Sequence, residues 1–177
     1  MGKGKKQRLQ GKKNKAKESS DSEDECKHID AEDLEHDAAP KELTSEERAY
    51  FDFGFDKLDK GQLLQKIKET EDMDEIIALT WAKDREVRLK ATREMCPCHV
   101  KAERKEFWDR IFALANDQDD NIRYQVLHNM CDGSPPHLED MVIKTLEIFN
   151  RDANKKIRRK AHQVMGSYLH GGDWNIM

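Results

Sequence analysis

The sequence predicts an all-α fold, a short α-solenoid that follows a disordered N-terminal tail. The stretch 111–130 recurs in altered form once before and once after itself. Each copy carries two apolar faces of helical spacing, separated by a polar break. A lone helix pair cannot bury such faces, but pairs stacked side by side can, so the copies predict an array with a continuous core.

The repeat has a period of 35 residues and is clearest at an arginine. Arg88, Arg123 and Arg158 occupy one column. Six columns hold apolar residues in every copy: Val87, Ile122 and Ile157; Met73, Trp108 and Ile143; Ile76, Ile111 and Leu146; Leu79, Leu114 and Phe149; Ala91, Val126 and Ala161; and Met95, Met130 and Met165. In the middle copy the break 116–121 is rich in residues that cap helices and favour turns. Each copy is therefore predicted to be a helix pair, and the three copies occupy 71–170.

The polar turn followed by Val/Ile-Arg at the start of a second helix resembles the HEAT repeat, a family of the armadillo-type fold. In that family an aspartate of the turn commonly pairs with the arginine of a neighbouring copy. Asp117 and Asp152 each stand six residues before Arg123 and Arg158, as this pattern requires. The resemblance therefore implies a structural ladder of Arg88, Arg123, Arg158, Asp117 and Asp152. A phosphate-reading stripe of arginines is the alternative interpretation.

The first copy departs from this pattern, because Ala82 takes the aspartate position and Asp84 is the nearest carboxylate. The period is close to that of tetratricopeptide repeats, but their Trp-x2-Leu-Gly-x2-Tyr pattern is absent. The resemblance covers roughly 72–169. It implies a scaffold for protein binding, although solenoids serve many tasks.

Composition bounds the remaining possibilities. The chain has 177 residues, enough for one ordinary domain plus tails, with 36% hydrophobic and 38% charged residues. The net charge of −4 gives no overall reason to expect a nucleic-acid or anionic-membrane partner. No apolar run approaches the roughly 18 residues of a membrane span, and no secretory signal is apparent. We expect a soluble monomer in the cytoplasm, the nucleus or both, not secreted, with reduced cysteines.

Residues 1–40 are predicted to be a disordered, charge-segregated tail. Its acidic half is 18–37, where Ser20 and Ser22 resemble substrates of acidophilic kinases. Its basic half is 3–17, with Lys3, Lys5, Lys6, Arg8, Lys12, Lys13, Lys15 and Lys17. Three uses stay open for the tail: contact with RNA or DNA, a nuclear-import signal, or an autoinhibitory contact between its acidic half and the basic patch described below.

Residues 41–70 are predicted to form N-terminal capping helices. Thr44-Ser-Glu-Glu47 is a capping box, followed by Tyr50, Phe51, Phe53 and Phe55. We interpret these aromatics as a lid on the first repeat, with a docking segment as the alternative. Residues 171–177 are predicted to be an apolar tailpiece that folds back on the last helix.

The chemical candidates are few. Cys96, Cys98, His128 and Cys131 form a weak candidate metal set, and the alternative is that these cysteines simply fill the core. No nucleophile motif, phosphate loop or His-Glu ligand pair is present, so neither an enzyme nor a cofactor is predicted. The second helix of the last copy opens with a basic patch of Lys155, Lys156, Arg158, Arg159 and Lys160, where the helix macrodipole disfavours cations.

These observations favour a non-catalytic adaptor that binds a protein partner of unknown identity. The alternative is a nucleic-acid- or ribosome-associated binder that uses the basic tail and the 155–160 patch. A zinc-stabilised or catalytic protein is a third and weaker hypothesis.

Overall fold

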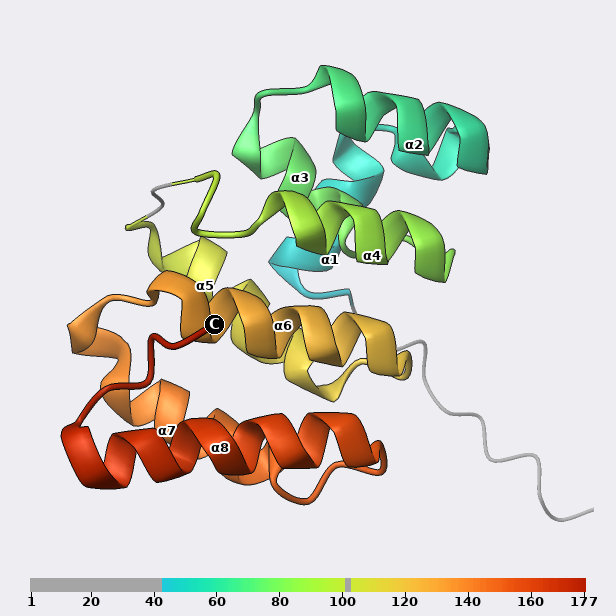
Figure 1. The fold of residues 1–177 in the computed structure, drawn as a ribbon. Helices are drawn as coiled ribbons and strands as arrows, with labels where there is room; N and C mark the ends of the chain where they lie inside the picture. The colour runs from blue at the N-terminus through green and yellow to red at the C-terminus, as the bar shows by residue number, and fades with distance from the viewer. Residues whose placement is uncertain (1–42, 101–102) are drawn as a thin grey trace, which may run out of the picture. The chain divides into compact units, whose positions relative to one another are not determined.

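A computed structural model describes residues 43–100 and 103–177, and over these residues the chain contains helices and no strand (Figure 1). The prediction of an all-helical fold is therefore confirmed for this part of the chain. The α-helices are α1 (Ser45–Asp52), α2 (Lys60–Glu69), α3 (Met73–Leu79), α4 (Arg85–Glu94), α5 (Lys105–Ala113), α6 (Asp120–Gly133), α7 (Glu139–Phe149) and α8 (Lys155–Gly171). Short 3-10 helices cover Phe55–Lys57, Leu114–Asn116 and Pro136–Leu138.

The chain divides into two units, 1–41 and 42–177, and every described helix belongs to the second. The predicted tail 1–40 lies outside the described residues. Within the described ranges no helix has the length and apolar character needed to cross a membrane.

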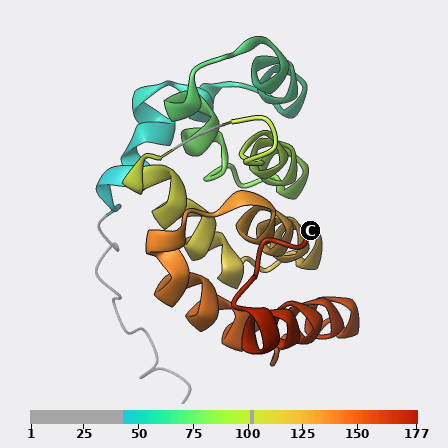
Figure 2. The same cartoon turned by 60° about the vertical axis from the view of Figure 1, so that its left-hand side comes forward.

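The helices of the second unit lie in two layers. Helices α2, α4, α6 and α8 lie side by side in one layer, and α1, α3, α5 and α7 form the other (Figures 1 and 2). Three helix pairs link the layers, because α3 packs on α4, α5 on α6, and α7 on α8. We call α4, α6 and α8 the second helices, since each is the second member of its pair.

The second helices begin at the same position in each copy. Asp84, Asp119 and Asn154 are their N-caps, and each side chain accepts a hydrogen bond of 2.8 Å from the backbone N–H two residues later. Each cap satisfies a donor that a helix start would otherwise leave unpaired, a contribution of about 1 kcal/mol. The polar break between the two helices of a copy is therefore what starts the second helix.

The core is built from the repeated apolar columns. Val87, Ile122 and Ile157 are fully buried, as are the three residues of the column that follows, Ala91, Val126 and Ala161. Burying one such isoleucine stabilises the fold by roughly 1.5–3 kcal/mol. Two columns are less buried than predicted, because Met73, Ile143 and Met165 are only partly buried. Ile143 and Met165 lie in the last copy, which within the described residues has a neighbouring helix pair on one side only, whereas Met73 lies in the first copy, which packs against α1 and α2 as well as α6.

The N-terminal helices carry the predicted capping box. The Glu47 N–H donates to Thr44 Oγ1 at 3.2 Å, and the Thr44 N–H donates to Glu47 Oε2 at 2.8 Å. The aromatic cluster that follows splits into two parts. Tyr50 and Phe55 are buried, whereas Phe51 and Phe53 remain exposed at 45% and 42%. Only half of the predicted lid therefore covers the core.

The C-terminal residues fold back, and they reach farther than the last helix. Helix α8 ends before Gly172, which adopts a left-handed conformation with φ 72°. Trp174 is then buried and donates from Nε1 to Ser134 Oγ at 2.7 Å. The Met177 N–H donates to the carbonyl of Cys131 at 3.1 Å, so the terminus lies against the end of α6 (Figure 1).

Candidate binding surface on the second helices

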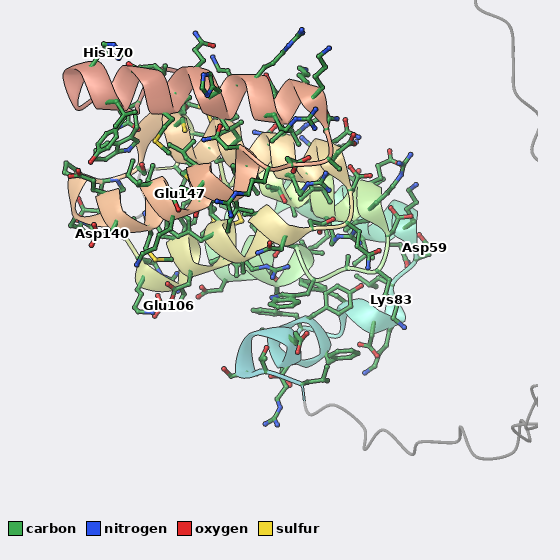
Figure 3. The ribbon with its side chains drawn as sticks, turned by 90° about the horizontal axis from the view of Figure 1, so that it is seen from below. Asp59, Lys83, Glu106, Asp140, Glu147 and His170 are labelled. Carbon is green, nitrogen blue, oxygen red and sulfur yellow. A yellow bond between two sulfur atoms is a disulfide. The ribbon has the colours of Figure 1, made fainter. Side chains whose placement is uncertain are left out.

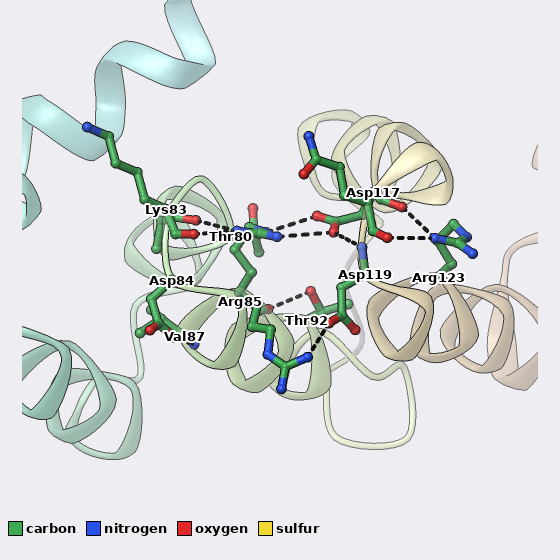
Figure 4. A network of polar contacts seen from close by, with 12 residues as sticks. Thr80, Lys83, Asp84, Arg85, Val87, Thr92, Asp117, Asp119 and Arg123 are labelled. Atoms are coloured by element: carbon green, nitrogen blue, oxygen red, sulfur yellow. Dashed lines mark hydrogen bonds and ion pairs between the residues drawn. The ribbon is translucent and has the colours of Figure 1, made fainter.

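Ion pairs connect the turns of successive copies. Arg88 donates from Nε and Nη2 to the carboxylate of Asp117 at 2.9 and 3.2 Å (Figure 4). Arg123 reaches Asp152 in the same way at 2.7 and 2.9 Å. Each pair is bidentate and joins one copy to the next. Such pairs are geometrically specific and stronger than single charged contacts.

The third guanidinium nitrogen, Nη1, binds within its own copy. In Arg88 it donates to the carbonyls of Ala82 and Lys83 at 3.0 and 2.9 Å. Arg123 and Arg158 make the equivalent pair of contacts in their own turns. The first copy therefore uses the backbone of Ala82, and its lack of an aspartate at that position leaves this contact intact.

The ladder has a direction: each arginine pairs with the turn aspartate of the next copy along the chain. We call this a forward ladder. Arg158, in the last copy, contacts carbonyl oxygens of its own turn. The hydrogen bond between Arg123 and Asp152 holds the pKa of the Asp152 carboxyl below its ordinary value and raises the pKa of Arg123. Arg88 and Arg123 are thus occupied by structural contacts, which disfavours a phosphate-reading stripe.

This direction makes a specific prediction about Asp117. Its six-residue spacing from Arg123 suggests that Asp117→Ala would leave Arg123 unpaired, but the structure gives its carboxylate to Arg88. We therefore expect a double-mutant cycle by chemical denaturation to show coupling of roughly 1–3 kcal/mol between Asp117→Ala and Arg88→Met. The matched cycle with Arg123→Met should give coupling near zero. Equal coupling in the two cycles would contradict the forward ladder.

The five cations of the predicted basic patch do not all lie on one surface. Arg158 turns to backbone carbonyls, whereas Lys155, Lys156, Arg159 and Lys160 line a surface hollow of about 530 Å³. The other residues lining this hollow are Tyr124, Asn154 and Gln163, so no carboxylate is among them. We call this set of seven residues the basic hollow.

The basic hollow lies between two second helices. Tyr124 comes from α6, and the Lys156 Nζ lies 4.1 Å from the centre of its ring, a cation–π contact. Asn154 is held in place by Asp120, whose Oδ2 accepts its Nδ2 hydrogen bond at 2.6 Å. The hollow therefore offers cationic groups around the face of one aromatic ring.

A second hollow of about 260 Å³ lies farther along the same layer, between α2 and α4. It is lined by Leu64, Lys68, Glu86, Leu89, Lys90 and Arg93. Two of its charges are already paired, because Lys90 contacts Glu94 and Glu86 contacts Lys60. Helix α8 differs from α2 and α4 because its sequence contains no acid, so its cations have no acidic partner within the helix.

The opposite layer has a different charge. Glu106 on α5, and Asp140 and Glu147 on α7, are exposed acids (Figure 3). A ligand that seeks positive charge is thus directed to the second helices and away from the first.

The candidate metal set is only partly brought together. Cys96 Sγ lies 3.7 Å from His128 Nε2, and Cys98 belongs to the same cluster. Cys131 does not: it is fully buried, and burial raises the pKa of its thiol to about 12. Its neighbour Asp132 takes its place, with Oδ2 at 3.4 Å from Cys96 Sγ. The structure therefore does not place Cys131 with this cluster, and its burial fits the alternative that it fills the core.

The cysteines also differ from expectation in their bonding. Reduced thiols are predicted, but Cys96 and Cys98 form a disulfide in the structure. Their Cα atoms are 5.3 Å apart, inside the range that a disulfide can bridge.

Several predicted residues cannot be placed. The basic tail 3–17 and the candidate phosphorylation sites Ser20 and Ser22 lie outside the described residues. Compared with protein-family models, with curated proteins and with solved structures, the chain matches none. Function is therefore inferred from the described side chains.

Some site residues were not predicted, although the repeat register contains a signal for them. Tyr124 follows Arg123 directly, so it shares a column with Arg159. Asp132 stands four residues after His128, and that spacing places both side chains on one face of a helix. The repeat register could have identified Tyr124, and the helical spacing from His128 could have identified Asp132.

Proposed function

We propose that the chain is a non-catalytic adaptor of the HEAT type, a short α-solenoid whose second helices bind an acidic segment of a protein partner. Two features support the repeat assignment: the 35-residue period of buried columns, and the ion pairs that join one copy to the next. The stacking of three helix pairs also fits a solenoid.

The basic hollow is the observation that carries the functional proposal. Four of its seven lining residues are cations and none is an acid. Lys155 and Lys156 lie in the first turn of α8, where the helix dipole opposes positive charge at about 0.3–1 kcal/mol per cation. Carboxylates of a bound acidic segment would offset this cost, and the Tyr124 ring would provide apolar contact.

Nucleic acid is the second candidate ligand, and Tyr124 is the observation that favours it. An aromatic face surrounded by cations is the combination by which single-stranded nucleic acids are bound, with bases stacked and phosphates paired. The basic tail 3–17 would add sequence-independent affinity. A protein partner is favoured because the hollow is small and uses one aromatic ring, whereas single-strand binding grooves stack successive bases.

The proposal predicts that removing the charge of the basic hollow weakens acidic-peptide binding. We expect the triple variant Lys156→Gln, Arg159→Gln and Lys160→Gln to bind a labelled Glu/Asp-rich peptide at least about tenfold more weakly, a loss of about 1.4 kcal/mol. Fluorescence anisotropy of the full chain measures this affinity. The matched control removes three cations near the other layer, by Lys105→Gln, Lys144→Gln and Arg151→Gln, and should keep the original affinity.

The two ligand classes are distinguished by a parallel titration with single-stranded RNA of the same length. A protein adaptor binds the peptide in preference to RNA, and the triple variant loses that preference. Tighter binding of RNA, with a slope of about −0.7 per neutralised phosphate in log affinity against log salt, would favour the nucleic-acid alternative. Equal loss in the triple variant and its control would reject the basic hollow as the site.

A further inference from the structure

Four side chains that can bind a metal meet where α4 ends against α6. Cys96 and Cys98 flank Pro97 directly after α4, and His128 and Asp132 lie one turn apart on α6. One ligand atom from each of Cys96, Cys98 and Asp132 lies within 4.8 Å of the other two. His128 is outside this mutual group, but its Nε2 lies 3.7 Å from Cys96 Sγ.

The separations match the edges of a tetrahedral zinc site. With Zn–S near 2.3 Å and Zn–N or Zn–O near 2.1 Å, a sulfur and a neighbouring nitrogen or oxygen are about 3.6 Å apart. The observed distances from Cys96 Sγ are 3.7 Å to His128 Nε2 and 3.4 Å to Asp132 Oδ2. Cys96 Sγ is therefore at the spacing of a tetrahedral edge from both the His128 nitrogen and the Asp132 oxygen.

The remaining ligand, Cys98, is able to move. Its side chain is exposed, whereas Cys96 is buried at 2% exposure and fixed by the end of α4. Once the Cys96–Cys98 bond is reduced, rotation of the Cys98 side chain can bring its sulfur to the fourth vertex. Two thiolates, an imidazole and a carboxylate form a donor set suited to zinc.

The surrounding fold holds the Cys-Pro-Cys segment against α6. A Cβ placed on Gly133 would lie 3.0 Å from Pro97 Cβ, so the absence of a side chain at Gly133 permits the close approach. The N–H groups of His99 and Val100 both donate to the carbonyl of Cys96, at 2.9 and 3.1 Å. The backbone around the cluster is therefore already shaped before a metal binds.

We propose that the reduced chain binds one Zn²⁺ through Cys96, Cys98, His128 and Asp132. A thiol or phosphine reductant supplies two electrons to the disulfide and is itself oxidised to a disulfide or a phosphine oxide, and two protons, from the thiols or from water, convert the two sulfurs to thiols. Zinc then displaces one proton from each thiol and binds two thiolates, neutral His128 and the Asp132 carboxylate. The ion connects the end of α4 to α6, so it is a structural link between the first and second helix pairs.

Metal binding by the full chain tests this proposal. Cys26 and two histidines lie near one another in the N-terminal sequence, so every variant carries Cys26→Ser to remove one competing ligand. After reduction with a phosphine, incubation with zinc and dialysis, elemental analysis should find one zinc per chain. Cobalt in place of zinc should give the intense visible bands of a tetrahedral site and a sulfur-to-cobalt charge-transfer band.

Single substitutions then identify the ligands. Loss of a residue that only supports a ligand costs about 10–100-fold in metal affinity, so Asp132→Asn and His128→Gln should each cost at least about tenfold. Cys98→Ser should remove the charge-transfer intensity of one sulfur while the helical circular dichroism stays unchanged, because Cys98 is exposed. The matched control His99→Gln changes an exposed histidine beside the cluster and should retain full affinity.

Three results would overturn the zinc site. The reduced chain could bind no stoichiometric metal. The ligand variants could lose no more affinity than His99→Gln, which would indicate adventitious surface binding. The Cys96–Cys98 disulfide could persist under reductant, which would leave no thiolates for the metal.

Discussion

Asp152→Ala is expected to lower the free energy of unfolding by about 3 kcal/mol, because it leaves the Arg123 guanidinium without its carboxylate. The pair is mostly buried, with side-chain exposures of 14% for Arg123 and 5% for Asp152. Breaking a fully buried pair costs about 3–5 kcal/mol, and the remaining exposure places this one at the lower end. Chemical denaturation monitored by circular dichroism measures the change.

The matched control is Asp109→Ala, which removes a carboxylate from an ion pair with Lys105 within one helix. Those side chains are exposed at 42% and 81%, so the loss should be at most about 1 kcal/mol. An equal loss in the two variants would show that the ladder contributes no more than a surface pair.

Acidification should reveal the same contact. The pKa of Asp152 is lowered from its ordinary value of 3.8, chiefly by the hydrogen bond from Arg123. Its stabilising contribution is therefore complete above the unfolded pKa and is lost as the pH falls through the folded pKa. Below about pH 4, the free energy of unfolding should fall more steeply with decreasing pH in the unsubstituted chain than in the Asp152→Ala variant. Parallel stability curves for the two proteins would contradict this assignment.

Asn129→Ala is expected to have a comparable effect, about 3 kcal/mol, for a different reason. Asn129 is fully buried on α6, and its Nδ2 donates to the carbonyls of Thr92 and Met95 at 2.8 and 3.2 Å. These carbonyls lie at the end of α4, where a helix leaves oxygens without intrahelical donors. Each buried acceptor left unpaired costs roughly 1–3 kcal/mol.

Gln125→Ala provides the control for Asn129. Gln125 donates to the Asn129 Oδ1 at 2.8 Å and is only partly buried, so its loss leaves both α4 carbonyls satisfied. We expect a loss near 1 kcal/mol by the same denaturation measurement. If Asn129→Ala cost no more than this control, the link between α4 and α6 would be apolar packing alone.

The repeated core could be predicted from the sequence because it depends on spacing alone. A column such as Val87, Ile122 and Ile157 stays apolar when each residue contacts the neighbouring copy, and all three are buried. Incomplete burial at Met165 could not be predicted from the columns, because a periodic pattern does not report which copy has a neighbour on one side only.

The polar contacts were harder to predict, since they depend on which copy supplies the partner and on the angular position of each side chain around its helix. The spacing places an aspartate near an arginine but does not show whether that arginine belongs to the same copy or to a neighbouring one. In the structure Asp117 pairs with Arg88 of the preceding copy. One residue along a helix is a rotation of about 100°, so Cys131 is buried while Asp132 faces the Cys96 sulfur. That rotation is why the sequence spacing selected Cys131 and not its neighbour Asp132.

The basic patch shows the same limit. Five cations adjacent in sequence look like one surface, but helical rotation turns Arg158 toward the carbonyl oxygens of its turn. The other four lie with Tyr124, which comes from a different copy. Composition therefore identified the charge, and only the packing of α6 against α8 identified the hollow.

Mapping the binding site of an acidic peptide tests the central claim most directly. The isotope-labelled chain is titrated with the Glu/Asp-rich peptide, and backbone amide chemical shifts are followed by nuclear magnetic resonance. The adaptor account predicts that the saturable shifts are confined to Tyr124 and 154–163, and that the triple variant Lys156→Gln, Arg159→Gln and Lys160→Gln abolishes them. Saturable shifts centred on α5 and α7, or none at all, would contradict it.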